Sequence, residues 1–184
     1  MHQELLERLV EQMGRLRLGP GIDDLDMGPL ISAGQRESVL DMIESGRGAG
    51  ARVIAPAPLD QPRGFFVAPT ILEAVTEQMA VAREEIFGPV LTVQTFRDDA
   101  EAAALADATA YGLAAGVYTR DLDRALAFAR DLQAGYVTVN EYFAGGVETP
   151  FGGRKLSGTG RERGLVALES YIRSKSVVLR IGSR

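Results

Sequence analysis

Two adjacent carboxylates precede an aromatic residue and a turn near the middle of the chain. Glu84 and Glu85 are separated by one residue from Phe87, which is followed by Gly88-Pro89. A carboxylate beside such a turn can accept hydrogen bonds from a sugar diol, as acidic residues do for ribose in dinucleotide sites. The alternative is a solvated acidic pair in front of a strand, and from the residue types alone we favour that alternative.

A second candidate region lies between a predicted strand and a glycine-rich turn. Pro150 and Phe151 begin a rigid turn, and Gly152 and Gly153 permit unusual dihedrals and close backbone approach. Ligands of parallel sheets bind outside the carboxyl ends of the strands. Because residues 140–153 directly follow a strand, they form a candidate binding region, with a plain surface loop as the alternative.

Two further glycine-rich segments favour structural interpretations. Residues 157–162 (SGTGRE) precede a predicted helix and could bind an anion, but we favour a cap and turn with a local Arg161–Glu162 pair. Residues 46–51 (GRGAGA) match the dinucleotide pattern GxGxxA. That pattern works between a strand and a following helix, whereas here a helix precedes and a strand follows, so we interpret it as a helix-terminating loop.

The composition excludes several kinds of active site. The 184 residues include no cysteine and one histidine, His2, so they hold no Ser-His-Asp triad, Cys-His pair or histidine-rich zinc site, and we expect no metal. The net charge of −5 argues against a nucleic-acid partner. No apolar run approaches the roughly 20 residues that span a bilayer, and the N-terminus lacks a signal-peptide pattern. We expect a cytoplasmic protein.

Apolar periodicity predicts the elements that must position these residues. It indicates a helix over residues 3–17, and Ser32 with Gln35 forms a capping box that opens a second helix ending near residues 46–48. Further helices are predicted at 99–108 and 121–132, and strands at 52–55, 65–67, 70–72, 90–96, 114–119 and 135–140. This alternation predicts an α/β fold with an open, mostly parallel, twisted sheet and helices on both faces.

The last part of the chain is predicted to be a helix over residues 160–171 and a strand over residues 172–181. In that strand Val177, Leu179 and Ile181 alternate with Val178 and Arg180. A short, terminal, apolar strand exposes a bare edge that invites pairing with another chain.

Several of these motifs together resemble the C-terminal part of an aldehyde dehydrogenase. The resemblance is collinear over nearly all of the chain, and a run of motifs in one order is specific. Its motifs are Gly28-Pro29-Leu30, Pro69-Thr70-Ile71, residues 84–90 (EEIFGPV), Tyr111-Gly112-Leu113, residues 150–153 (PFGG), Ser157-Gly158, residues 160–162 (GRE) and Lys175.

The resemblance implies roles for six residues. On the cofactor side, Glu85 would contact the nicotinamide ribose and Phe87 would pack near the nicotinamide ring. On the substrate side, Phe151 would lie beside the aldehyde pocket and Asn140 would border it. Tyr142 and Phe143 would fall in a variable stretch that shapes substrate choice, and a core-packing role for these two stays equally open.

The resemblance also implies which parts of the reaction this sequence lacks. Family members oxidise an aldehyde with NAD or NADP through a cysteine thiolate, a glutamate general base and an oxyanion-stabilising asparagine. In the family these groups and the cofactor domain lie upstream of the region at which Met1 begins. We therefore expect residues 1–171 to resemble part of the catalytic domain and residues 172–184 to form an oligomerisation strand and tail, with no catalytic residue.

Three functional hypotheses follow from that expectation. The chain is the C-terminal portion of an aldehyde dehydrogenase, one half of a split enzyme, or a non-catalytic interaction module. We expect it to bind no cofactor and to oxidise no aldehyde when isolated. Its expected partner is a second copy or the missing N-terminal portion, through residues 172–181, and no membrane is expected.

Overall fold

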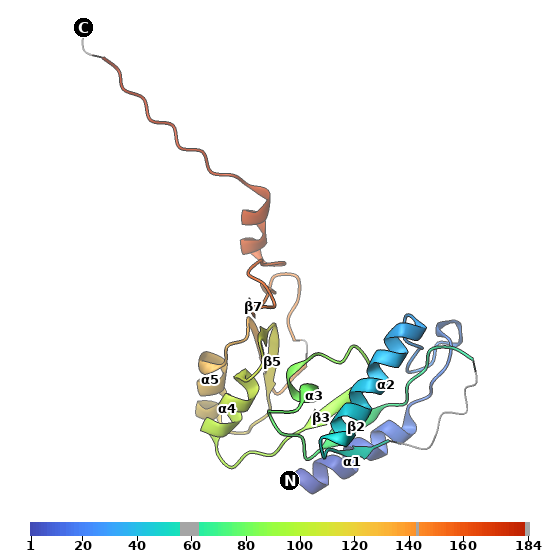
Figure 1. Cartoon of the computed structure of the whole chain (residues 1–184). Helices are drawn as coiled ribbons and strands as arrows, with labels where there is room; N and C mark the ends of the chain where they lie inside the picture. Colours follow the sequence, from blue (N-terminus) through green and yellow to red (C-terminus); the bar gives the residue numbers. More distant parts are fainter. Residues whose placement is uncertain (56–62, 143, 183–184) are drawn as a thin grey trace. The chain divides into compact units, whose positions relative to one another are not determined.

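The computed structural model describes residues 1–55, 63–142 and 144–182 of the chain (Figure 1). Packing divides the chain into two compact units, Met1–Ala102 and Ala103–Arg184. The boundary that the sequence predicts between residues 171 and 172 separates the catalytic-domain-like region from an oligomerisation tail. It does not describe compactness, and it stays a prediction.

The first unit combines helices with a small three-stranded sheet. Strand β2 is central: it pairs antiparallel with β1 and parallel with β3, with Thr70 opposite Val90 and Glu73 opposite Val93. The elements are α1 (His2–Arg15), the 3-10 turn η1 (Gly21–Asp23), α2 (Ala33–Gly48), β1 (Arg52–Ile54), β2 (Thr70–Glu73), α3 (Ala80–Arg83) and β3 (Val90–Val93), with α4 (Asp99–Asp107) continuing past residue 102.

Local sequence signals explain how α2 begins and ends. The Ser32 hydroxyl accepts a hydrogen bond from the Gln35 backbone N–H at 3.1 Å, as the predicted cap requires. At the other end, Gly50 has φ +104°, and the Ala51 N–H donates to the Gly46 carbonyl at 2.9 Å. Residues 46–51 are therefore a helix-terminating loop, as predicted.

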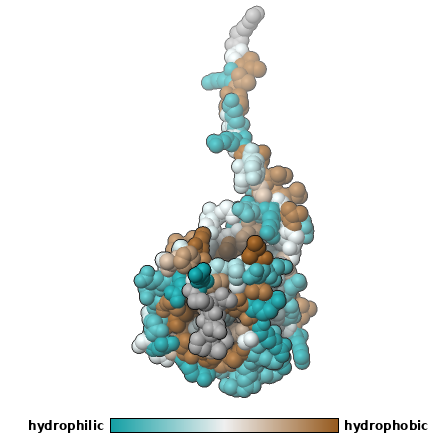
Figure 2. All heavy atoms as spheres, turned by 90° about the vertical axis from the view of Figure 1, so that its right-hand side faces the viewer, coloured by the Kyte–Doolittle hydropathy of each residue, from teal (hydrophilic) through white to brown (hydrophobic). Residues whose placement is uncertain are grey.

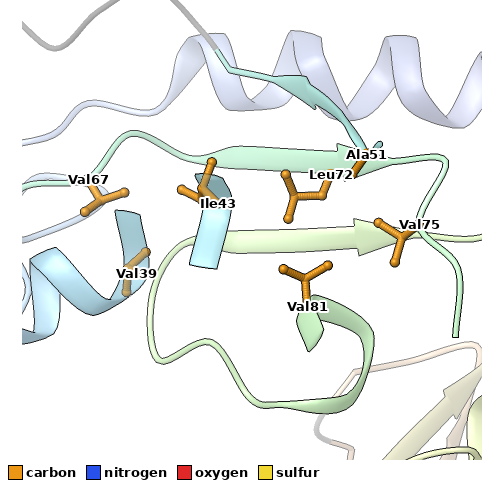
Figure 3. Close-up of a cluster of buried hydrophobic side chains, with 7 residues drawn as sticks. All are labelled: Val39, Ile43, Ala51, Val67, Leu72, Val75 and Val81. Carbon is orange, nitrogen blue, oxygen red and sulfur yellow. The ribbon is translucent and has the colours of Figure 1, made fainter. Parts of the chain in front are cut away.

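The core of the first unit lies between α2, the sheet and α3. Figure 3 shows Val39 and Ile43 of α2, Leu72 of β2 and Val81 of α3 pointing into one apolar space, together with Ala51, Val67 and Val75. Val39 and Leu72 are fully buried. Each fully buried side chain of this size contributes about 1.5–3 kcal/mol.

The second unit contains a β–α–β segment. Strands β5 (Ala114–Val117) and β6 (Tyr136–Val139) pair in parallel and are connected through α5 (Leu122–Asp131). The Asp121 carboxylate caps α5 by accepting from the Arg124 N–H at 3.1 Å. The predicted helix and both predicted strands are confirmed, although each is somewhat shorter than expected.

The α/β class is confirmed, but the predicted single sheet is not observed. In the described ranges the strands form three separate sheets, and two of the four strand pairings are antiparallel. One antiparallel pair joins β4 (Tyr111–Gly112) to β7 (Arg154–Lys155), which are too short for periodicity to predict. The prediction of one open, mostly parallel sheet is therefore wrong for the described ranges, because the strands pair in three separate groups, one in the first unit and two in the second.

Two predicted strands need correction. Residues 65–67 are not a strand, because the Phe65 and Phe66 carbonyls accept from the Leu30 N–H and the Arg36 guanidinium instead of from a neighbouring strand. Strand β3 ends at Val93 rather than at residue 96, because its partner β2 ends at Glu73.

The predicted helix over residues 160–171 is also shorter and of a different type. A 3-10 helix, η2, spans Leu165–Tyr171. Glu162 instead pairs with Phe151 in an isolated antiparallel bridge, and Arg163 and Gly164 have φ of 60° and 57°, a left-handed conformation that an α-helix cannot contain.

The chain after η2 is extended. Residues 172–182 form no strand ladder with any residue that the structure describes, so the oligomerisation strand stays a prediction (Figure 1). Both hydrophobic and hydrophilic residues are displayed along this extension (Figure 2), and Val178 and Ile181 are 95% and 92% exposed.

Candidate functional site

One candidate site is the loop after α3. Ile86 packs against the core of the first unit, whereas the Phe87 side chain is 66% exposed. Glu84 and Glu85 are exposed, and neither carboxylate has a hydrogen-bond or ion-pair partner among the residues described. The loop therefore presents an aromatic ring and two uncompensated carboxylates on a segment that is anchored by Ile86.

Three contacts fix the backbone of this loop. The Gln35 side-chain amide donates to the Phe87 carbonyl at 3.0 Å, and the Thr70 N–H donates to the Pro89 carbonyl at 2.9 Å. Gly88 lies so close to α2 that an added Cβ would meet Val39 Cγ2 at 2.7 Å. Glycine is thus required at position 88 by close packing, with no need for an unusual dihedral.

An apolar hollow of about 360 Å³ lies beside the Phe87 ring. It is lined by Met27, Gly28, Leu30, Val67, Phe87, Gly88 and Pro89. A flat, largely apolar ring is the kind of group that such a surface can contact, while a carboxylate nearby can accept hydrogen bonds from hydroxyl groups.

A second, separate candidate site is in the other unit, at the end of β6. Asn140 has φ +57°, and its side chain bridges to the Thr119 backbone: the carbonyl oxygen accepts from the Thr119 N–H and the amide donates to the Thr119 carbonyl, both at 2.8 Å. Both ends of the Asn140 amide are therefore engaged in holding the chain after β5 to the end of β6.

Phe151 is held by aromatic and backbone contacts. Its ring meets the Tyr136 ring edge-on at 5.5 Å between centroids, and the Arg163 guanidinium lies 5.7 Å from its centroid. Its backbone exchanges two hydrogen bonds of 2.7 Å with Glu162. These contacts make Phe151 part of a small aromatic cluster.

The glycines around Phe151 permit unusually close packing. A Cβ added at Gly135 would collide with the Gly152 carbonyl oxygen, and one added at Gly152 would collide with the Gly160 carbonyl oxygen. The close backbone approach predicted for Gly152 and Gly153 is confirmed, whereas neither glycine has a positive φ, so the predicted unusual dihedrals are not observed.

Tyr142 lies next to the same aromatic cluster. It is 76% exposed and lines a small hollow together with Tyr136, Thr138, Ala114, Ala115 and Gly116. Tyr136 therefore connects Tyr142 with Phe151, while Phe143 lies outside the described residues. Glu85 and Phe87 belong to the other compact unit.

The remaining polar candidates have structural contacts. The Ser157 hydroxyl accepts from the Gly112 N–H at 3.1 Å, and the Lys155 ammonium donates to the Asp107 and Thr109 carbonyls at 3.0 Å each. The Arg161 guanidinium donates to the Gly153 carbonyl at 2.8 Å. The predicted turn at residues 157–162 is present, but the predicted Arg161–Glu162 pair is not, because Arg161 binds backbone carbonyls.

Sequence reasoning missed three residues of these clusters. Gln35 is 52 positions from Phe87, Tyr136 is one of several β-forming residues in its strand, and Arg163 follows a glycine-rich turn. Only the tertiary fold brings them to Phe87 and Phe151, so no local pattern pointed to them.

Two further observations concern metal binding and membrane insertion. No group of three or more histidine, cysteine, aspartate or glutamate residues suited to a metal ion occurs in residues 1–55, 63–142 and 144–182. Within those same ranges, no helix combines the length and apolarity needed to cross a membrane.

Comparison with known sequences relates the chain to one protein family. Residues 1–177 match the aldehyde dehydrogenase family. A betaine aldehyde dehydrogenase of Cereibacter sphaeroides is 45% identical over 181 residues, covering 98% of this chain and 38% of that protein. One of Brucella melitensis is 42% identical, covering 99% of this chain and 38% of that protein. The chain thus spans about 38% of the length of the curated relatives it matches.

Solved structures agree with this relationship. An NAD-dependent aldehyde dehydrogenase from Sinorhizobium meliloti has a TM-score of 0.91 at 36% identity, covering 99% of this chain and 37% of that chain. An aldehyde dehydrogenase from Bacillus cereus in complex with NAD+ has a TM-score of 0.91 at 40% identity, covering 98% and 37%. The match over residues 1–177 and these structural similarities establish that the chain belongs to the aldehyde dehydrogenase family.

Proposed function

We propose that this chain is the C-terminal portion of an NAD(P)-dependent aldehyde dehydrogenase and contributes the nicotinamide-ribose contact and the substrate rim. The observation that carries the proposal is the loop of residues 84–89. Its backbone is tied to α2 and β2, yet it exposes 66% of the Phe87 side chain beside an apolar hollow and leaves the neighbouring Glu85 without a partner. An anchored loop that exposes an aromatic ring is suited to a ligand that covers the ring.

The residues present fit a dinucleotide with a flat ring and a sugar diol. The Glu85 carboxylate would accept hydrogen bonds from the ribose hydroxyls, and Phe87 would pack near the nicotinamide ring. NAD(P)+ supplies the hydride acceptor when it is bound. Glu85 and Phe87 would orient that acceptor, and the Phe87 ring would exclude water from one side.

On the substrate side, aromatic residues would form one wall of the aldehyde pocket. Phe151 and Tyr142 would contact the substrate; the Tyr136 ring meets the Phe151 ring edge-on and lines a hollow together with Tyr142. From the resemblance alone, Phe143 would fall in the same variable stretch as Tyr142. Asn140 would border the pocket by holding the ends of β5 and β6 together rather than by touching the substrate, since both ends of its amide bind Thr119.

The chemical step would need a nucleophile from outside these 184 residues. The sequence contains no cysteine, and two alternative nucleophiles beside the glycine-rich turn, Ser157 and Lys155, are engaged with backbone groups. The thiolate and general base would come from an upstream portion, either in one longer polypeptide or in a separate chain.

The first experiment measures NADH and NADPH formation by the purified chain. Betaine aldehyde heads the substrate panel, because betaine aldehyde dehydrogenases are among the relatives. We expect no turnover and no micromolar NAD+ binding, because Glu85 and Phe87 alone cannot hold a dinucleotide. Turnover by the isolated chain would contradict the proposal that it lacks the nucleophile.

The second experiment joins the chain to the cysteine-bearing and cofactor-binding N-terminal portion of a related aldehyde dehydrogenase, the one from Cereibacter sphaeroides that the chain resembles, and repeats the assay. We expect aldehyde oxidation, with Glu85→Gln raising the KM for NAD+ by about ten-fold or more, because a hydrogen bond to a charged group is lost. Glu84→Gln is the matched control and should change KM little. A folded, rejoined protein that oxidises no aldehyde would overturn the proposed function.

The extended tail supports a second candidate function, a non-catalytic interaction module. Val177, Val178 and Leu179 are 70%, 95% and 82% exposed, and a bare apolar strand can add to the edge of another sheet. This function would require binding to a complete family member, or to a second copy, without added turnover. Deletion of residues 172–184 should then abolish the binding measured by light scattering, and unchanged binding would exclude this role for the tail.

A further inference from the structure

We infer that Gln35 is a positioning residue that fixes the loop presenting Phe87, an inference whose catalytic meaning rests on the proposed function. In a capping box the residue three positions after the cap returns its side chain to the backbone N–H of the cap. Here Ser32 caps the N–H of Gln35, but the Gln35 side chain does not return to Ser32. Its amide reaches across the fold to the Phe87 carbonyl at 3.0 Å.

The first turn of α2 is bonded to two segments that border the hollow beside Phe87. Gln35 binds the carbonyl of Phe87, which lines the hollow, and its neighbour Arg36 donates from Nε at 3.1 Å to the carbonyl of Phe66, which directly precedes the lining residue Val67. The Phe65 carbonyl in the same segment accepts at 2.9 Å from the N–H of Leu30, another lining residue.

The Phe87 side chain has little packing of its own to hold it. Two-thirds of it is exposed, so its direction depends on the backbone that carries it. Ile86 before it and Gly88 after it are pressed against the core, which fixes their positions but leaves the Phe87 peptide group to be oriented. The Gln35 amide is the one side-chain donor to that carbonyl among the described residues.

A purely structural role would be helix capping, and the variant Gln35→Glu separates the two roles. Glutamate at the third position of a helix is favourable, since it can complete a capping box and complements the helix dipole. It cannot donate to the Phe87 carbonyl in its charged form. Helix stability should therefore be kept or improved, while the tie to Phe87 is lost.

The test on the chain itself uses tryptophan as a reporter at position 87. The sequence contains no tryptophan, so Phe87→Trp places a single fluorophore in the loop. Adding Gln35→Glu should raise the population of displaced loop by about 2- to 12-fold, the equivalent of one hydrogen bond, and should be seen as lower anisotropy and greater acrylamide quenching. The thermal midpoint should not fall.

The matched control is Gln78→Glu in the same reporter chain. Gln78 is exposed in the same unit and donates to Glu77 at 2.8 Å, away from Phe87. Equal anisotropy and quenching in the Gln35→Glu and Gln78→Glu proteins would overturn the inference. A lower midpoint without a fluorescence change would assign Gln35 to stability alone and would overturn it as well.

A second readout uses the rejoined enzyme with Phe87 restored. Gln35→Glu should raise the KM for NAD+ by about 2- to 12-fold with a smaller change in kcat, because positioning of the bound cofactor is weakened. An unchanged KM would contradict a positioning role. If the rejoined enzyme with Gln35 is inactive, the proposed function fails, and the fluorescence comparison still decides whether Gln35 orders the loop.

Discussion

At the scale of single residues, neighbours along the chain have opposite surroundings. Ile86 and Gly88 face the core, while Phe87 between them faces solvent. The Phe87 ring can stay exposed only if contacts fix the backbone of residues 86–88, because burial of an aromatic ring is otherwise favourable. Gly88 supplies part of that restraint through its contact with Val39.

The contact at Gly88 leads to a prediction about stability. Gly88→Ala should destabilise the protein by about 1–3 kcal/mol, because the new Cβ would lie 2.7 Å and 2.9 Å from the Val39 methyl groups. Gly34→Ala, in α2 with nothing within 4 Å of the added Cβ, should instead stabilise by about 0.5–1 kcal/mol. Urea denaturation of both variants checks this, and equal effects would show that close packing is not what requires glycine at position 88.

A second prediction concerns the loop that follows α1. The Arg17 side chain and backbone N–H donate to Asp26, and they lower the pKa of its carboxyl from 3.8 to about 2. A lowered pKa means that the stabilising contribution is present above pH 3.8 and is lost as the pH falls through about 2.

Carbon NMR of the Asp26 carboxyl measures this pKa directly. Arg17→Gln should return it toward 3.8, since the charged donor is removed. Arg15→Gln should leave it lowered, because Arg15 pairs with Glu11. A low Asp26 pKa that persists in the Arg17→Gln protein would mean that another group causes it.

At the scale of elements, Asn140 joins the carboxyl ends of β5 and β6 through two hydrogen bonds to Thr119. Asparagine suits this place for two reasons. It tolerates the left-handed φ of +57°, and its amide both donates to and accepts from Thr119. The candidate substrate residues Tyr142 and Phe151 follow this clamp along the chain.

Substitutions at Asn140 should therefore have graded effects. Asn140→Ala should destabilise by about 1–3 kcal/mol, because two net hydrogen bonds of about 0.5–1.5 kcal/mol each are lost. Asn140→Asp should cost less, because aspartate still accepts from the Thr119 N–H at the same left-handed dihedrals. Thermal unfolding compares the two variants, and equal losses would mean that the hydrogen bond from the Thr119 N–H contributes nothing measurable.

At the scale of the whole molecule, each compact unit contains its own sheets. The buried cluster of Val39, Ile43, Ala51, Val67, Leu72, Val75 and Val81 lies entirely within Met1–Ala102. A unit of this size with a closed core satisfies the usual requirements for independent folding.

We therefore predict that residues 1–98 unfold cooperatively as an isolated fragment. Circular dichroism during urea denaturation measures this, and a gradual, non-cooperative loss of signal would contradict it. Leu72→Ala in the same fragment is the companion variant. It removes a side chain with 0% exposure and should cost about 2–5 kcal/mol, so it tests whether the observed transition reports this core.

The sequence by itself determined the family, the α/β class and the elements whose signals are local. Helices α1, α2 and α5 follow from apolar spacing, and α2 also from the cap Ser32, a signal that acts over three residues. The motif at residues 84–90 pointed to Glu85 and Phe87 because it is contiguous. Such features are readable because both partners lie within one turn of the chain.

Only the tertiary structure decided which distant groups meet. It divided the strands among three sheets. It also paired the Gln35 side chain with the Phe87 carbonyl instead of with Ser32, and the Asn140 amide with Thr119. A hydrogen-bonding side chain satisfies whichever partner the fold brings within about 3 Å, and residues 52 or 21 positions apart leave no periodic trace in the sequence. The distant partners of these polar side chains are therefore set by packing.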